Sequence, residues 1–134
     1  MKFKLTHRKV DGVAIVDLGG HLILGQETGA LRTTIEELLA AGEKKVLLNL
    51  AGVGYIDSCG LSLLVGGFLS ATSAKGQMKL VNLDRRVHDV IRVTRLHTVF
   101  EVFNDEREAI HSFAAAPSQA AAAPGRFTAD SVAS

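Results

Sequence analysis

Apolar and polar residues alternate at the start of the chain. Residues 2–7 follow a period of two, which predicts a half-exposed strand. A turn at Val10-Asp11-Gly12 leads into a second apolar run at residues 13–18. Together they predict a β-hairpin, which we expect to end at Gly19-Gly20.

Helical and strand periods then alternate. Four apolar residues on one helical face predict a helix that ends at Gly42: Leu31, Ile35, Leu38 and Leu39. An uninterrupted apolar run at residues 46–50 predicts a central strand, buried on both faces. A helix over about residues 58–75 and a strand over residues 78–83 follow.

The last elements are shorter. The spacing of four residues predicts the next helix: Val87, Val90, Ile91 and Thr94. Residues 99–103 are predicted as a short edge strand. A capping box at residues 105–108 then opens a helix that buries Ile110 and Phe113.

One hairpin followed by alternating strands and helices predicts the α/β class. We expect a small, mixed, mostly parallel β-sheet with right-handed crossovers and about four helices packed against it. Residues 1–113 form this domain. Residues 114–134 are rich in alanine and offer almost nothing large to bury, which predicts a flexible tail.

Composition narrows the function classes. The chain has 134 residues, the size of one domain, and a net charge of +1, which gives no electrostatic argument for binding nucleic acid. Its single cysteine excludes an internal disulfide and fits a reducing compartment. No apolar run approaches the ~20 residues that span a bilayer, and no signal peptide is visible. We therefore expect a cytoplasmic domain without direct membrane insertion.

One serine stands at a chemically distinctive position. Ser58 lies where the buried strand passes through a loop at residues 51–56 into the apolar helix. The N-terminus of a helix favours anionic groups, so a phosphate here would be tolerated while changing the local charge by about −1.5 to −2. The alternative is that Ser58 is a simple helix N-cap.

The residues around Ser58 form a recognisable pattern. Asn49-Leu50, then Ile56-Asp57-Ser58-Cys59-Gly60-Leu61, then Leu64, resembles the signature of bacterial anti-sigma factor antagonists, the stand-alone STAS domains. The resemblance implies that Ser58 is phosphorylated. It implies that the unmodified domain binds an anti-sigma factor that is also a serine kinase, and that this kinase releases it with ATP and magnesium. A metal-dependent serine phosphatase would restore the binding form, and the domain would have no turnover of its own.

The expected partner surface surrounds that serine. It comprises Asp57, Ser58, Cys59, Gly60, Leu61, Ser62, Leu63 and Gly66. Asp57 would frame the loop, and Gly60 would let the partner approach the backbone. A partner helix could also lie over Gly66-Gly67, between Leu63 and Leu69; the alternative is that the domain itself covers this helix on several sides. The sequence leaves open whether the chain forms a homodimer.

One departure from the family bears on the kinase. Members usually carry Gly-Glu-Leu-Asp after the first hairpin, whereas this chain has Gly20-His21-Leu22-Ile23 and lacks both acids. The alternatives are a scaffold subunit of a stress-signalling complex, or a small subunit of a lipid-trafficking ABC transporter.

Enzyme and metal chemistry find little support. The glycines at 52 and 54 imitate a dinucleotide fingerprint, but Asp57 replaces its third glycine. Ile56 breaks the elbow pattern of a serine hydrolase. The five histidines and Cys59 show no metal-ligand spacing, so we expect no catalytic residue, cofactor or metal.

A cluster of basic residues remains after these exclusions. It comprises Arg85, Arg86, Arg92 and Arg95, interrupted by Asp84 and Asp89. A solvated helix face explains it. The alternative is a docking surface for an acidic partner or a phosphate.

Overall fold

The computed structural model describes residues 3–23 and 29–115. Its elements follow in chain order: β1 (Lys4–Val10), β2 (Val13–Leu22), α1 (Gly29–Ala40), β3 (Lys45–Ile56), α2 (Ser58–Ser73), β4 (Gln77–Val81), α3 (Arg85–Val93), the 3₁₀ turn η1 (Leu96–Thr98), β5 (Val102–Phe103) and α4 (Glu106–Ala115). The strands form one five-stranded sheet in the order β1-β2-β3-β4-β5. Only the β1–β2 hairpin is antiparallel. The predicted α/β fold is confirmed.

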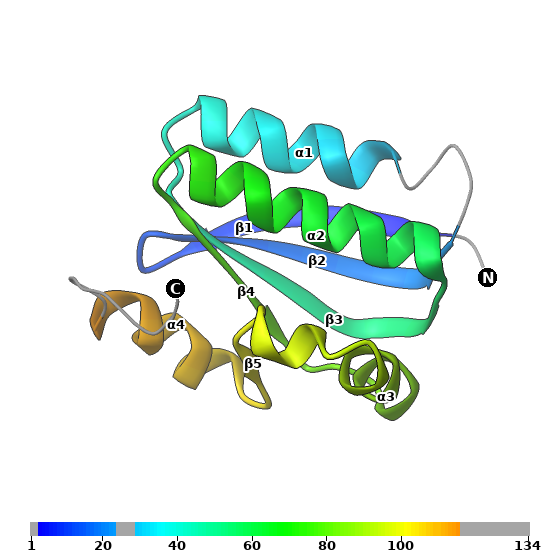
Figure 1. The fold of residues 1–134 in the computed structure, drawn as a ribbon. Helices are drawn as coiled ribbons and strands as arrows, with labels where there is room; N and C mark the ends of the chain where they lie inside the picture. Colours follow the sequence, from blue (N-terminus) through cyan, green and yellow to red (C-terminus); the bar gives the residue numbers. More distant parts are fainter. Residues whose placement is uncertain (1–2, 24–28, 116–134) are drawn as a thin grey trace.

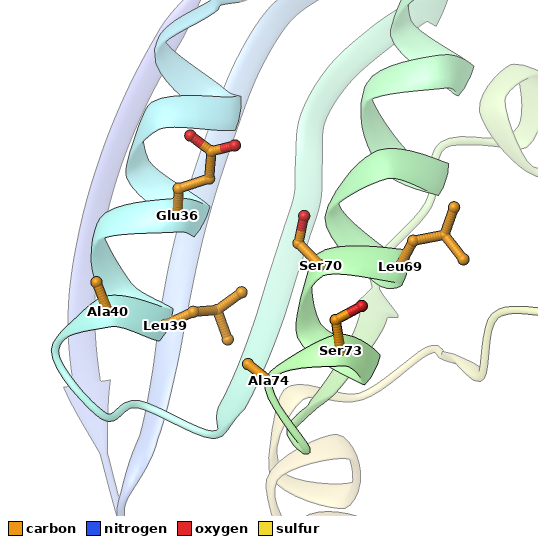
Figure 2. A pocket seen from close by; sticks show the side chains of 7 residues that line it. All are labelled: Glu36, Leu39, Ala40, Leu69, Ser70, Ser73 and Ala74. Atoms are coloured by element: carbon orange, nitrogen blue, oxygen red, sulfur yellow. The ribbon is translucent and has the colours of Figure 1, made fainter.

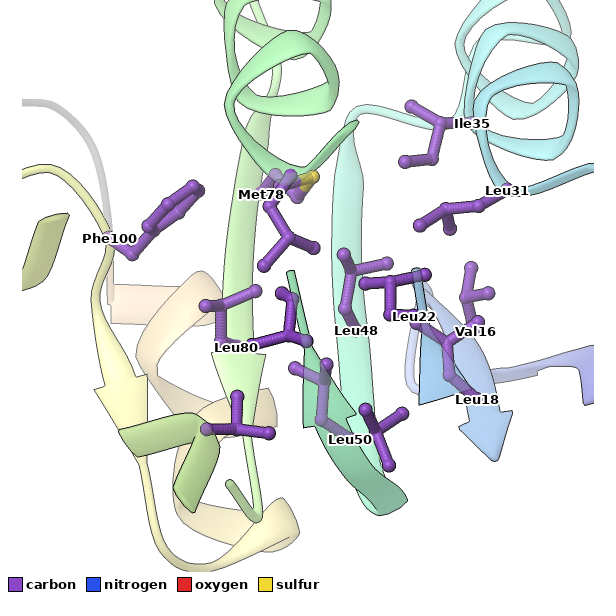
Figure 3. Packing of buried hydrophobic residues seen from close by; sticks show 14 of the residues in the cluster. Val16, Leu18, Leu22, Leu31, Ile35, Leu48, Leu50, Met78, Leu80 and Phe100 are labelled. Carbon is purple, nitrogen blue, oxygen red and sulfur yellow. The ribbon is translucent and has the colours of Figure 1, made fainter. Parts of the chain in front are cut away.

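Helices cover both faces of the sheet. α1 and α2 lie side by side on one face, and α4 lies on the other (Figure 1). The core under α1 and α2 joins strand residues such as Val16 and Leu48 to Leu31 and Leu64 from the helices (Figure 3). A second core lies under α4 and contains Leu47. Because neighbouring strand residues point to opposite faces, these two cores explain the uninterrupted apolar run at residues 46–50.

The first two parallel strands are longer than predicted. β2 continues through Gly19-Gly20 to Leu22, and β3 continues to Ile56 beside it. The expected end of the hairpin at Gly19-Gly20 was therefore wrong. A Cβ added to Gly52 would lie 3.0 Å from the carbonyl oxygen of Leu18. Gly52 therefore permits the close approach of β2 and β3, and Gly20, with a φ of +88°, lies at a register shift between the two strands instead of ending them.

The segment after α3 forms less strand than predicted. Only Val102–Phe103 pairs with β4, while the chain before it turns inward to bury Phe100. The Phe100 ring packs edge-on against Phe68 of α2, with 5.5 Å between ring centroids. Burial of this ring under α2 outweighs the edge pairing that Val99 and Phe100 would otherwise make, while the Glu101 carbonyl still accepts the Leu80 N–H at 3.0 Å.

α4 begins as its sequence predicts. The Asp105 carboxylate accepts the Glu108 N–H at 3.1 Å, and Ile110 and Phe113 are buried. The helix continues to Ala115, two residues past the expected domain boundary. The rest of the expected tail, residues 116–134, lies outside the described residues.

Candidate functional site

Ser58 is the first residue of α2 and is exposed. The helix is capped by its neighbour Asp57, whose Oδ1 accepts the Gly60 N–H at 2.9 Å. Within the described part of the chain, no hydrogen bond engages the Ser58 hydroxyl. The interpretation of Ser58 as a simple N-cap was therefore wrong, because a carboxylate already fills that role. The hydroxyl is left available for modification.

A backbone hydrogen bond to the end of β2 holds the loop that carries Ser58. The Asp57 N–H donates to the carbonyl oxygen of Leu22 at 3.2 Å. Gly60 is buried, and a Cβ there would lie 2.7 Å from Ile56 Cγ1 and collide with the same Leu22 carbonyl. The expected role of Gly60, close approach of a partner, is not the one that the structure gives it. Its missing side chain lets α2 pack on the strand end.

The outer side of α2 is small and uncharged. Five of its exposed residues recur every three or four positions, so they share one face: Ser58, Ser62, Gly66, Leu69 and Ser73. We call this set the α2 face. Thr72 is also exposed and lies at the edge of this face. No residue of α2 carries a charge. Leu69 is 58% exposed and is the large apolar side chain of this face.

The two adjacent glycines of α2 have opposite roles. A Cβ on Gly67 would lie 2.8 Å from Ile35 Cδ1, so Gly67 permits the close contact between α2 and α1. A Cβ on Gly66 would meet nothing within 4 Å. Leu63 is half-buried and packs against the main core. The domain itself therefore covers Gly67 and much of Leu63, whereas Gly66 and Leu69 stay open, and a partner helix over them stays a prediction.

A groove adjoins the far end of the α2 face. It runs between the last turns of α1 and α2, with a volume of about 530 Å³. Seven residues line it: Glu36, Leu39, Ala40, Leu69, Ser70, Ser73 and Ala74 (Figure 2). Leu39 points from α1 toward α2 there. Sequence reasoning missed this groove because it depends on the spacing of two helices.

His21 stands where family members usually carry the first acid of Gly-Glu-Leu-Asp, and its ring pairs with that of Tyr55. His21 pairs in register with Tyr55, and their rings meet edge-on with 6.0 Å between centroids. Tyr55 is 49% exposed and stands three residues before Ser58. Ile23, at the second position, is half-buried. The strand ends beside the serine are therefore aromatic and apolar instead of acidic.

Asn49, the first residue of the signature, has a structural role. Its amide donates to Asp17 on β2 at 2.8 Å, and its oxygen accepts from Asn82 at 3.2 Å. Asp17 also accepts from Arg8 at 2.8 Å. This Arg8 hydrogen bond, aided by Asn49 and opposed by desolvation, holds the pKa of Asp17 below its usual value. The network ties together the strands from which the Ser58 loop emerges.

Three further features are the lone cysteine, the side chains that could bind a metal, and the length of the helices. Cys59 is a half-buried free thiol. Within residues 3–23 and 29–115, no group of three or more His, Cys, Asp and Glu side chains is arranged to hold a metal ion. Among the described helices, none is long and apolar enough to span a membrane.

The profile of the STAS domain family matches residues 4–109, which covers the sheet, the Ser58 loop, α1 to α3 and the first turn of α4. The chain belongs to the STAS domain family. This confirms the resemblance carried by the residues around Ser58.

Several similar proteins are named anti-sigma factor antagonists. BtrV of Bordetella bronchiseptica, provisionally named an anti-sigma factor antagonist, is 27% identical over 110 residues, covering 82% of this chain and 94% of BtrV. A crystal structure from Thermotoga maritima with the same provisional name superposes with a TM-score of 0.76 at 25% identity, over 82% of this chain and 94% of the other. The anti-sigma factor antagonist SpoIIAA in its unphosphorylated form superposes with a TM-score of 0.71 at 20% identity, over 87% of this chain and all of SpoIIAA. The last of these shows the fold alone.

Proposed function

We propose that this STAS domain is an anti-sigma factor antagonist controlled by phosphorylation of Ser58. In its unmodified form it binds an anti-sigma factor that is also a serine kinase, which frees a sigma factor for transcription. The observation that carries the proposal is the exposed Ser58 hydroxyl, left unengaged by the Asp57 cap at the start of the uncharged α2 face.

The α2 face is suited to binding that a phosphate can abolish. The α2 face carries no charged residue. A partner bound to it would exclude water around Ser58, and the α2 face would offer no positive charge to pair with a phosphate there. A phosphate would add about −1.5 to −2 charges at the rim of that contact. Burying an unpaired charge is costly, so the complex would dissociate. In the free protein the helix N-terminus and open solvent accommodate the same group.

The partner contacts run along α2 from its first turn. We assign them to Asp57, Ser58, Cys59, Leu61, Ser62, Leu63 and Gly66, with Gly60 supporting the turn from inside. Beyond these, the contact continues over Gly66 to Leu69 and the adjoining groove. A helix of the partner fits this track, because the missing side chain at Gly66 allows close approach and Leu69 supplies an apolar anchor.

The similar proteins support this assignment. BtrV and the Thermotoga maritima protein carry the provisional name anti-sigma factor antagonist. SpoIIAA has been solved in unphosphorylated and phosphorylated forms. By analogy, a serine phosphatase regenerates the binding form of this chain, and the chain acts in the cytoplasm as a substrate of enzymes without turnover.

One observation favours a second function. The His21–Tyr55 pair replaces the acid expected beside the serine, which alters the surface that a family kinase would meet. A STAS subunit that serves as a scaffold in a stress-signalling complex, or in a lipid-trafficking ABC transporter, would not need that kinase.

A kinase reaction distinguishes the two. The full chain is incubated with anti-sigma factor serine kinases from the source genome and Mg-ATP, and the product is analysed by peptide mass spectrometry. We expect a single phosphate on Ser58. Calorimetry should then show kinase binding by the wild type and Ser58→Ala, with strong loss in Ser58→Asp and none in the exposed control Thr33→Asp. Phosphate on Ser62 or Thr72 with Ser58 unmodified would refute the assignment.

A further inference from the structure

α3 carries basic side chains that the domain itself does not neutralise. Its arginines are exposed, as is the one that follows it: Arg85, Arg86, Arg92 and Arg95. Within the described residues, none of these four guanidinium groups forms an ion pair or a side-chain hydrogen bond. Elsewhere Arg8 pairs with Asp17 and Glu106, and Arg32 pairs with Glu36. The charge of the α3 arginines is therefore left for solvent or a ligand.

The same segment exposes apolar groups. Val93 is 82% exposed and Val99 is 40% exposed. Neither is needed for the core, because α3 already buries Val87 and Ile91 on its inner side. Exposed apolar side chains within a few residues of exposed arginines match the composition of protein interfaces, in which arginine is enriched and an apolar centre is common.

We propose that this surface docks an acidic surface of a protein partner with an apolar centre. It consists of Arg85, Arg86, Arg92, Val93, Arg95 and Val99, and we call it the α3 surface. Carboxylates on the partner would pair with the arginines, and its apolar groups would contact Val93 and Val99. The arginines also raise the association rate of an acidic partner by electrostatic steering.

The composition of the α3 surface favours protein over nucleic acid. Asp84 and Asp89 lie among the arginines and lower the local positive charge, which weakens any purely electrostatic contact. The exposed Val93 and Val99 suit an apolar contact with a protein and offer nothing to a phosphate backbone. The chain as a whole carries a net charge of only +1. The α3 surface contains no tyrosine, tryptophan or phenylalanine on which single-stranded bases could stack.

The α3 surface goes beyond the proposed function. It is charged, whereas the α2 face is not, and it contains none of the residues assigned to the phosphorylation-controlled contact. Its occupancy does not require modification of Ser58. The two contacts are therefore separable by mutation.

Amide NMR of the full chain tests the proposal. The probe is a short synthetic peptide of glutamates flanking two leucines, titrated into the ¹⁵N-labelled protein at about 0.15 M salt, where weak long-range attraction is screened. We expect shift changes concentrated in residues 85–99. Replacing the four arginines by glutamine should weaken binding at least about tenfold, and Val93→Asn should weaken it by roughly threefold or more. Ser58→Asp should leave peptide binding unchanged, whatever its effect on a kinase.

A charge-matched control keeps the test specific. It removes four positive charges elsewhere, by glutamine substitution of Lys4, Lys45, Lys75 and Arg107. This variant should bind the peptide within roughly twofold of wild type, and the dispersion of the amide spectrum checks that each variant folds. Equal weakening by the control, shift changes scattered over the surface, or no effect of Val93→Asn would overturn the proposal. Tighter binding of an oligothymidylate than of the peptide would also overturn it and assign the surface to nucleic acid.

Discussion

The Asp57 carboxylate accepts the Gly60 N–H at 2.9 Å and so caps the helix that Ser58 begins. Ser58 therefore does not have to cap the helix. A residue that can be phosphorylated without loss of the fold must not hold the fold together. Ser58 meets that condition, because Asp57 caps the helix in its place.

Two glycines of α2 provide a matched pair of substitutions. Gly60→Ala should destabilise the domain by about 2 kcal/mol or more, because its methyl would overlap the Leu22 carbonyl. Gly66→Ala should stabilise it by up to about 1 kcal/mol, since its methyl meets open space and alanine favours the helix. Urea denaturation measures both. Similar effects of the two changes would contradict the packing described for Gly60.

Leu69 should matter for binding and not for folding. Its side chain is 58% exposed, so Leu69→Asn should change the free energy of unfolding by less than about 0.5 kcal/mol. Loss of an apolar anchor should weaken the kinase complex about tenfold, measured by calorimetry. The control Thr33→Asn lies at an exposed position of α1, outside the α2 face and the adjoining groove. If both variants bind as the wild type does, the partner does not reach Leu69.

The acid stability of the domain should depend in part on Asp17. Its pKa is lower in the folded state than in the unfolded chain, chiefly through the Arg8 hydrogen bond. The stabilisation is therefore present above the unfolded pKa of about 3.9 and is lost as the pH falls toward the folded pKa. Asp17→Asn should cost about 1 kcal/mol or less at pH 6, since the pair is partly exposed, and the cost should shrink by pH 3.

Unfolding curves of the wild type and Asp17→Asn across this pH range measure that dependence. Asp89→Asn is the control, because Asp89 is exposed and has no ion-pair partner among the described residues. A stability difference for Asp17→Asn that stays constant with pH would show that the carboxylate charge is not its source.

The alanine-rich end should be dispensable for folding. Truncation after Ala115 keeps all of α4 and removes only residues of the expected tail. The melting temperature and kinase affinity should match those of the full chain, since the removed segment has few large apolar residues to bury. A drop of several degrees, which corresponds to about 1 kcal/mol in a domain of this size, would mean that the segment docks on the domain.

Ser58 should not behave as a nucleophile. A serine hydroxyl needs a general base within hydrogen-bond reach to be activated near neutral pH, and no described residue hydrogen-bonds to it. An organophosphonate probe should therefore leave Ser58 unlabelled, and hydrolysis of activated esters should equal that of Ser58→Ala. Stoichiometric labelling of Ser58 would overturn the binding-module interpretation.

The sequence by itself determined the order of elements and the place of Ser58. Local hydrophobic periods report which side of an element is buried, so they predicted the hairpin, the buried strand and the helices. The residues from Asn49 to Leu64 likewise identified the family. Three of them have structural roles that fix their type: Asn49 joins neighbouring strands, Asp57 caps α2, and Gly60 lets α2 pack on the strand end.

Only the tertiary structure decided what each small or polar residue contacts. Gly66 and Gly67 are neighbours in sequence, yet one faces solvent and the other faces Ile35 on α1. Lys79 is 4% exposed, and its ammonium donates to Ser112 of α4 at 2.9 Å and lies 4.6 Å from the centre of the Phe113 ring. Burial of Lys79 lowers its pKa. The partners in these contacts lie about 30 residues away along the chain, and a local pattern holds no information about which distant element will cover a side chain.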